Sequence, residues 1–397
     1  MCNATRIRPC WAAPGARGAR VRTVSETLST SPLHARHTEL GAKFAEFGGF
    51  EMPLQYSGVV DEHTAVRERV GLFDVSHLGK ATVTGEGATA FLDRCFTNTL
   101  AKIGEGMAQY TLCCNSDGGV LDDMIVYVRA ADDVLLVPNA ANNAEVVRRL
   151  TESAAAAPEP VEVRNVHTDW AVLAVQGPSS AATLEALGLP TEHPYMSMQD
   201  ASLPGVPEVV VCRSGYTGER GYELLVRSEH AEQVWDAVMS AGEPYGIVPC
   251  GLGARDTLRT DMGYPLHGQD LSPDITPVEG RSSWAVGWDK PEFWGREALL
   301  AQRAAGPSRR LRGIRAVGRG IPRPGMTVRA QDAEGGDDGR VGQVTSGTFS
   351  PTLRQGIGLA LLDVAVGEGD QVVVDVRGRS ETFDVVRPPF VQAGDSS

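Results

Sequence analysis

The sequence lacks any long hydrophobic run. Its 397 residues contain no stretch of about 18 consecutive apolar residues, which excludes a transmembrane helix. Positive charge is also scarce, since 37 Lys and Arg face 50 Asp and Glu and leave a formal net charge of −13 at pH 7. This excess of negative charge argues against general nucleic-acid binding and against association with anionic membranes.

Regularly spaced cysteines and histidines are absent as well. The seven Cys are odd in number and irregular in spacing, which argues against a disulfide framework. The eight His include no HxxxH pair and no Cys/His cluster, so no metal site is predicted. We therefore expect reduced cysteines that serve as small apolar residues in a cytoplasm-like compartment.

A convincing dinucleotide-binding fingerprint is also missing. Gly85, Gly87 and Ala90 match the GxGxxA pattern, but the strand before them is short and half polar. No acidic residue follows at the end of a second strand about twenty residues later, as this kind of site requires. A plain turn from a strand to a helix explains the segment better.

The chain divides into regions of different character. Residues 1–32 include five Arg and one acidic residue, Glu26, and fit either an organelle transit peptide or a disordered start; we expect a disordered N-terminal extension. Strands and helices alternate over residues 33–305, with residues 78–160 as a second, interleaved domain. Short strands separated by Gly, Pro and Asp turns predict a C-terminal antiparallel barrel over residues 309–397.

Two consecutive carboxylates stand out in the segment GGVLDDMIVYV (118–128), which otherwise has the pattern of a buried strand. Asp122 faces one side of this strand with Met124, and Asp123 faces the other side with Ile125. An uncompensated buried carboxylate is costly, so each is paired, protonated or part of a reaction site. The alternative, that both begin the strand and cap the turn before it, stays open.

Two further segments carry candidate binding groups. In RSGYTGERGYE (213–223) three glycines permit close backbone approach, and Glu223 lies where the chain re-enters an apolar strand. Its carboxylate can accept two parallel N–H bonds from an aminopyrimidinone edge, or it is a surface Glu of a hairpin. In GLGARDTLR (251–259) Arg255 can bind a carboxylate or stabilise a buried Asp, or it is a solvated charge on a helix.

Taken together, eight segments in a fixed order resemble one known family. They are GFEMPLQY (49–56), DEHTAVRERVGLFDVSHL (61–78), GGVLDDMIVY (118–127), AVQGP (174–178), GYTGERGYE (215–223), CGLGARDTLR (250–259), TPVEGRSSWAVGW (276–288) and QVTSGTFSPTL (343–353). These segments resemble the aminomethyltransferases, the T-proteins of the glycine cleavage system. The resemblance extends from about residue 33 to residue 391.

The resemblance implies a fold and an activity. The expected fold is α+β, a three-domain ring of the folate-binding aminomethyltransferase type with a C-terminal antiparallel β-barrel. The expected activity transfers the methylene of the aminomethyl group on lipoylated H-protein to tetrahydrofolate, the co-substrate, and releases ammonia. The product is 5,10-methylenetetrahydrofolate, formed without metal, flavin or nicotinamide. A cytoplasmic monomer is expected.

The resemblance also assigns roles to individual residues. It implies that Asp122 is the catalytic carboxylate near the folate nitrogens and that Asp123 is structural. Glu223 matches the residue that holds the pterin ring. The remaining matches are folate-contacting or channel-lining positions: Tyr216, Arg255, Tyr110, Asn139 and Trp284. The C-terminal sequence RPPFVQAGDSS (387–397) lacks the tyrosine that eukaryotic members carry, which puts contacts to the folate glutamate tail in doubt.

Two other functions remain as alternatives within the same superfamily. A folate-dependent demethylase of a small methylated compound would keep the pterin pocket and change the residues on the acceptor side. A folate-binding protein of iron–sulfur assembly would carry a KGCYxGQE-type motif, whereas this chain has RSGYTGERGYE with Cys212 before the turn. That difference disfavours the assembly protein.

Overall fold

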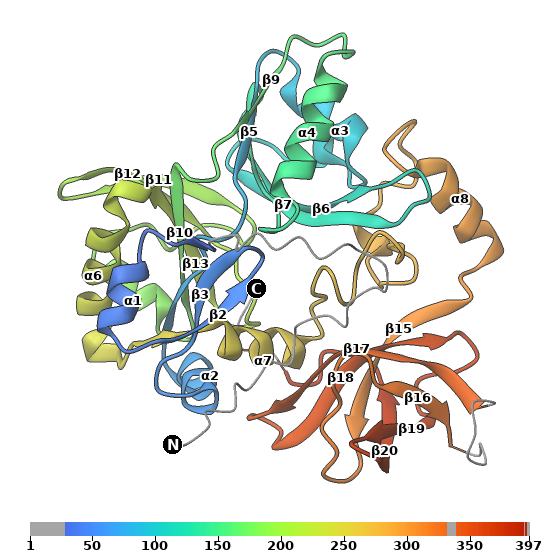
Figure 1. Ribbon diagram of the computed structural model, residues 1–397. Helices are drawn as coiled ribbons and strands as arrows, with labels where there is room; N and C mark the ends of the chain where they lie inside the picture. Colours follow the sequence, from blue (N-terminus) through green and yellow to red (C-terminus); the bar gives the residue numbers. More distant parts are fainter. Residues whose placement is uncertain (1–27, 332–338, 393, 395–397) are drawn as a thin grey trace.

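Three lobes surround the centre of the molecule in the computed structural model, which describes residues 28–331, 339–392 and 394 (Figure 1). Residues 1–27, most of the predicted N-terminal extension, lie outside the described residues. The mixture of helices and strands and a closed six-stranded barrel confirm the predicted α+β class with a C-terminal antiparallel barrel.

The first lobe is built on a six-stranded sheet with the order β11-β12-β13-β10-β4-β14. Its strands are β4 (Gly71–Asp74), β10 (Trp170–Gln176), β11 (Met198–Leu203), β12 (Val206–Cys212), β13 (Gly221–Arg227) and β14 (Val248–Cys250). All seven residues of β10 are buried, as is typical of a strand covered on both faces. One face packs under α5 (Ser180–Glu185) and α6 (Ala231–Gly242), whose Trp235 is buried against Leu224 and Leu173.

A smaller three-stranded sheet and several helices complete this lobe. They are β1 (Ser29–Thr30), β2 (Lys43–Phe47), β3 (Phe50–Gln55), α1 (His34–Glu39), α2 (Val59–Glu68), α7 (Leu252–Met262), η2 (Ser228–His230) and η3 (Glu243–Tyr245). Helix α7 packs against α2, β3 and the third lobe, and it therefore lies near the centre of the molecule (Figure 1).

The second lobe is a five-stranded sheet with the order β6-β7-β8-β5-β9. Its elements are β5 (Ala81–Thr84), β6 (Met107–Cys114), β7 (Val120–Ala130), β8 (Asp133–Val137), β9 (Glu162–Asn165), α3 (Ala88–Cys95), α4 (Asn143–Ala154) and η1 (Leu100–Lys102). Phe91 of α3 and Leu150 of α4 are buried against Met124 and Val126 on one face of the sheet. The other face turns toward the first lobe, where Tyr127 joins a shared core.

The third lobe is a closed barrel with the order β15-β18-β17-β16-β19-β20, in which every strand pair is antiparallel. Its strands are β15 (Arg309–Ala316), β16 (Thr327–Ala330), β17 (Arg340–Ser350), β18 (Gln355–Asp363), β19 (Gln371–Val376) and β20 (Arg379–Val386). A long segment that includes η4 (Ser283–Ala285) and α8 (Arg296–Ala305) leads from the first lobe to the barrel.

Buried polar contacts fix the barrel against α7. The guanidinium of Arg259 on α7 donates to Asp270 Oδ2 and to Ser346 Oγ on β17, each at 2.9 Å. The backbone N–H of Phe390 donates to the Asp261 carbonyl oxygen at 2.8 Å. Because Arg259 and Asp270 are both buried, loss of Arg259 would leave Asp270 without its cation, so Arg259 helps to hold α7 and β17 in one arrangement.

Neither a membrane-spanning helix nor a metal-binding cluster is found in the described part of the chain. None of its helices is long and apolar enough to cross a bilayer. No group of three or more His, Cys, Asp or Glu side chains within residues 28–331, 339–392 and 394 is placed to hold a metal ion. The five described cysteines are free and buried.

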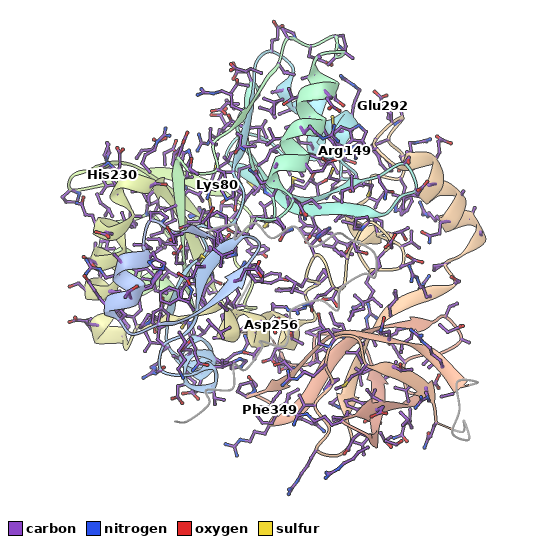
Figure 2. The ribbon with its side chains drawn as sticks, viewed as in Figure 1. Lys80, Arg149, His230, Asp256, Glu292 and Phe349 are labelled. Carbon is purple, nitrogen blue, oxygen red and sulfur yellow. The ribbon has the colours of Figure 1, made fainter. Side chains whose placement is uncertain are left out.

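Lys80 is a buried cation on the connection from β4 to β5, where the chain passes from the first lobe to the second (Figure 2). Its side chain is fully buried, and Nζ donates to the Ser76 carbonyl oxygen at 2.7 Å. Burial lowers the pKa of Lys80 to about 7, although the charge of Asp74 acts in the opposite direction. Between pH 7 and 10.5 the unfolded chain therefore binds a proton that the folded chain does not, and stability rises with pH in this window.

We predict that Lys80→Met raises the free energy of unfolding at pH 6 by about 2 kcal/mol, because it removes a buried charge. The gain should shrink between pH 7 and 9, where the folded wild-type protein has already lost the proton. Urea unfolding at several pH values measures both effects. Lys102→Met removes an exposed charge on η1 and is the matched control; an equal pH dependence in both variants would contradict the assignment.

Candidate functional site

The largest described cavity, about 590 Å³, lies where the three lobes meet. This volume falls in the range of small-molecule sites. The second lobe contributes Asn98, Ile103, Ala108, Gln109, Tyr110, Asp123 and Ile125; the first contributes Tyr195, Met196, Gly215, Tyr216 and Met262–Pro265; the barrel side contributes Gly280–Ser282, Trp284, Leu311, Pro388 and Pro389. The wall is mostly apolar, and Asp123 is the carboxylate among these residues.

Strand alternation separates the two consecutive carboxylates of β7. Asp122 pairs across the hairpin with Cys113, on the face that packs under α3 and α4, and it is 0% exposed. Asp123 pairs with Leu112 on the opposite face, which is also the face of Tyr110 and of the cavity. The sequence analysis placed Asp122 near the bound folate and gave Asp123 a structural role. In the structure, Asp123 lines the cavity and Asp122 is buried behind it.

Asn139, which lies just after β8, donates hydrogen bonds to both carboxylates. Its side-chain Nδ2 lies 2.8 Å from Asp122 Oδ1 and 3.1 Å from Asp123 Oδ1, and its backbone N–H donates to Asp122 Oδ2 at 3.1 Å. The hydroxyl of Tyr110 donates to Asp123 Oδ2 at 3.0 Å. Asp123 is thus held at both oxygens by neutral donors, which fix its orientation without neutralising its charge.

A second amide and a histidine complete this network behind Asp122. Asn142 Nδ2 lies 2.7 Å from Asp122 Oδ1 and 3.0 Å from His267 Nδ1. Nε2 of His267 lies 3.0 Å from the Val120 carbonyl oxygen, which can only accept. This contact assigns the ring proton to Nε2 and leaves Nδ1 to accept from Asn142.

Burial dominates the electrostatics of the carboxylate pair. Burial raises the pKa of Asp122 well above its usual range, and the charge of Asp123 raises it further against the donors of Asn142 and Asn139. Burial also raises the pKa of Asp123, whereas His267 and the hydrogen bond from Tyr110 lower it. Asp123 is therefore a poorly solvated carboxyl group, and a cation that enters the cavity would favour its ionised form.

Two stacked aromatic pairs form part of the cavity wall. Tyr110 and Trp284 stack with ring centroids 5.2 Å apart and an interplanar angle of 23°. Tyr216 and Tyr264 stack at 5.7 Å and 25°. Trp284 is 69% exposed although it is a large hydrophobic residue, so one of its ring faces remains available to a flat ligand.

Arg255 and Glu223 lie behind the cavity wall rather than in it. The guanidinium of Arg255 on α7 lies 4.7 Å from the Tyr216 ring centroid and lines an adjacent cavity of about 80 Å³. Glu223 on β13 accepts a hydrogen bond of 2.5 Å from Ser214 Oγ, next to the lining residue Gly215. The predicted residues Tyr110, Tyr216 and Trp284 therefore line the large cavity, while Asn139, Arg255 and Glu223 border it from behind.

The sequence analysis missed several cavity residues. Tyr195, Tyr264 and Arg281 all come from irregular segments, where no periodic pattern indicates which way a side chain points. His267 was likewise not expected beside the carboxylates. For Asp123 a usable signal did exist, because its pairing with β6 places it on the same face as Tyr110, a residue already expected in the channel.

Comparisons with known proteins agree with this architecture. Residues 33–290 match the family model described as the GCVT N-terminal domain, and residues 309–392 match the glycine cleavage T-protein C-terminal barrel domain. The chain is 63% identical over 368 residues to the aminomethyltransferase of Parafrankia sp. (strain EAN1pec), which covers 92% of this chain and 98% of that protein. It is 59% identical to the aminomethyltransferase of Mycobacterium tuberculosis (strain H37Rv) over 92% of this chain and 97% of that protein.

A solved structure is similar over almost the whole chain. The glycine cleavage system aminomethyltransferase T from Bartonella henselae superimposes with a TM-score of 0.85 at 34% sequence identity. The match covers 93% of this chain and 99% of that protein. The likeness therefore includes all three lobes.

We predict that Asn139→Ala lowers the free energy of unfolding at pH 7 by about 1–3 kcal/mol, because the buried Asp122 and the half-buried Asp123 lose a shared donor. Asn142→Ala removes a donor from Asp122 alone and should cost less. Urea unfolding compares the two variants. The deficit of Asn139→Ala should narrow at acidic pH, where the carboxyls take up protons; an equal deficit at every pH, or a larger deficit for Asn142→Ala, would contradict the shared-donor role.

Proposed function

Because this chain belongs to the aminomethyltransferases, the folate-dependent T-proteins of the glycine cleavage system, we propose that its central cavity carries out their reaction with tetrahydrofolate as co-substrate. The methylene of an aminomethyl group on the lipoyl arm of H-protein passes to N5 and N10 of tetrahydrofolate, ammonia and the lipoyl thiol leave with the two displaced protons, and 5,10-methylenetetrahydrofolate forms. The observation that carries the proposal is the Asp123 carboxylate, set into an otherwise largely apolar cavity between the lobes.

The cavity fits the shape and chemistry of a folate. Its volume of about 590 Å³ suits a ligand of this size, and the two aromatic pairs offer flat surfaces on which a pterin and an aminobenzoyl ring can stack. We assign Tyr110 and Trp284 to one ring-binding wall and Tyr216 to the other. When bound, tetrahydrofolate supplies the nitrogen nucleophiles N5 and N10 that take up the methylene.

Asp123, in place of Asp122, is the carboxylate that we propose for catalysis. Departure of ammonia from the aminomethyl carbon develops positive charge on that carbon. A fixed anion in a cavity of low polarity stabilises such charge more than water does, because it needs no reorganisation as the charge appears. Tyr110 and Asn139 hold the two carboxylate oxygens, and either oxygen can also take up a proton released from nitrogen.

Glu223 and Arg255 are proposed as the polar contacts of the pterin end. Glu223 comes from the sheet face that packs toward the second lobe, and its charge acts on both Tyr195 and Arg255. A carboxylate there can accept the amino and N3–H donors of a pterin as a pair of parallel hydrogen bonds. Arg255 is held over Tyr216, and its charge interacts with that of the half-buried Glu223.

Three features of the proposal remain predictions. The lipoyl arm of H-protein must reach Asp123 from outside the cavity, and the docking face is not assigned. A cytoplasmic location and a monomeric state are carried over from the sequence analysis. The demethylase alternative differs in its product, since only the aminomethyltransferase reaction releases ammonia.

We predict that Asp123→Asn lowers the rate of ammonia release from aminomethyl-loaded H-protein by about 100- to 1000-fold, because it removes the anion that faces the reacting carbon. Single-turnover assays with tetrahydrofolate measure the rate. Asp122→Asn is the matched control, since it makes the same change one residue earlier on the buried face; it should lower the rate by less than about tenfold. Equal losses in the two variants, or the larger loss in Asp122→Asn, would remove Asp123 from the mechanism.

We predict that Glu223→Gln weakens tetrahydrofolate binding by about 10- to 100-fold, because a hydrogen bond to a charged group is worth about 1.5–3 kcal/mol. Isothermal titration calorimetry gives the affinity, and circular dichroism checks the fold. Glu219→Gln removes a carboxylate of the same hairpin that pairs with Arg67 at 2.8 Å, so it should alter stability and leave affinity intact. Unchanged affinity in Glu223→Gln would reject the pterin assignment.

A further inference from the structure

His267 lies in a turn that reaches from the first lobe to the second. The turn follows α7 and is fixed at Asp270, whose buried Oδ2 accepts a hydrogen bond of 2.9 Å from the backbone N–H of Leu266. The segment after the turn contacts β7, because the backbone N–H of Val120 donates to the Ser272 carbonyl oxygen at 2.9 Å. His267 is therefore held against the strand that carries both carboxylates.

Close packing leaves this segment little freedom against β7. A Cβ atom at Gly119, just before β7, would lie 1.8 Å from the Pro273 carbonyl oxygen, so only glycine lets the two segments approach this closely. Nε2 of His267 donates to the Val120 carbonyl oxygen at 3.0 Å. The imidazole is thus anchored at Nε2, and its other nitrogen, Nδ1, faces the side chain of Asn142.

The side-chain nitrogen of Asn142 lies between His267 and Asp122. It is 3.0 Å from His267 Nδ1 and 2.7 Å from Asp122 Oδ1. An amide nitrogen carries two hydrogens, and each of them has one acceptor here. If the amide turned over, its oxygen would face the lone pairs of both acceptors. His267 Nδ1 therefore fixes which end of the Asn142 amide faces Asp122.

The same oxygen of Asp122 connects Asn142 to the cavity carboxylate. Oδ1 of Asp122 also accepts from Asn139 Nδ2 at 2.8 Å. This nitrogen has two hydrogens but a third and fourth contact, with Asp123 Oδ1 at 3.1 Å and the Asp123 carbonyl oxygen at 2.8 Å, so its acceptors compete for it. The hydrogen bond from Asn142 satisfies Asp122 and leaves Asn139 available to Asp123.

The electrostatics of Asp123 agree with this arrangement. Burial raises the pKa of Asp123, and among the groups that oppose this shift the charge of His267 acts most strongly. The imidazole is therefore near enough to act on the cavity carboxylate, although it lies behind Asp122.

We propose that His267 is a positioning residue of the aminomethyl transfer, an inference that rests on the function proposed above. Its Nδ1 orients Asn142, which satisfies Asp122. Asn139 then holds Asp123 toward the reacting carbon. Loss of the Nδ1 acceptor should make Asp122 compete with Asp123 for Asn139, and the cavity carboxylate should lose part of its fixed orientation. A reaction that depends on a preorganised anion is slowed by a small displacement of that anion.

Two replacements of His267 separate the roles of its ring nitrogens. An asparagine amide places an oxygen near the position of Nδ1, whereas a glutamine amide reaches the position of Nε2. His267→Asn therefore keeps an acceptor for Asn142, and His267→Gln keeps a donor for the Val120 carbonyl oxygen. In single-turnover assays with tetrahydrofolate and aminomethyl-loaded H-protein, His267→Gln should slow ammonia release about tenfold and His267→Asn less than about threefold.

Two further measurements separate positioning from a general structural role. Isothermal titration calorimetry should give a tetrahydrofolate affinity within about twofold of wild type for both variants, because a positioning residue changes the rate and not the binding of the ligand. In an Asn142→Ala background, His267→Gln should slow the reaction by no more than a further factor of about two, since both changes break the same chain of hydrogen bonds.

Each possible result bears on the proposal. A rate for His267→Gln within about twofold of wild type overturns it, as does an equal loss in His267→Asn, which would make the Val120 anchor or the charge the important feature. Absence of ammonia release by the wild-type protein would instead reject the proposed function itself. If His267→Gln does not fold, Asn142→Ala decides the question: a loss of about tenfold in rate with unchanged folate affinity supports the proposal, and an unchanged rate overturns it.

Discussion

The two-residue period of a β-strand is the constraint on which the site depends. It sends two consecutive carboxylates of β7 to opposite faces, so that Asp122 enters the core under α3 and α4 while Asp123 faces the cavity. The arrangement is tolerable because Asn139 donates to both and Tyr110 donates to Asp123. Held by neutral donors and half-buried in a largely apolar cavity wall, Asp123 offers its carboxylate to a reacting cation.

Each of the three lobes contributes residues to the cavity around Asp123. The second lobe supplies Asp123 and Tyr110, the first supplies Tyr216 behind which Arg255 lies, and the barrel side supplies Trp284 and Arg281. The buried hydrogen bonds of Arg259 and Asp270 to Ser346 on β17 hold α7 against the barrel and so fix the distance between the walls.

Periodic patterns and motifs in a fixed order predict the fold class, the barrel and the aromatic residues of the cavity wall from the sequence. The choice between Asp122 and Asp123 could not be made from alternation alone, since both faces of β7 are apolar. It follows from the pairing of β7 with β6, which places Tyr110 opposite Ile125 and Leu112 opposite Asp123.

The most direct test of the central claim is a crystal structure of the protein with bound tetrahydrofolate. The account predicts that a carboxylate oxygen of Asp123 lies within hydrogen-bonding range, about 3 Å, of the reactive nitrogens of the folate, with Asp122 still enclosed under α4. A folate whose reactive nitrogens lie far from Asp123, or that approaches Asp122 instead, would contradict it.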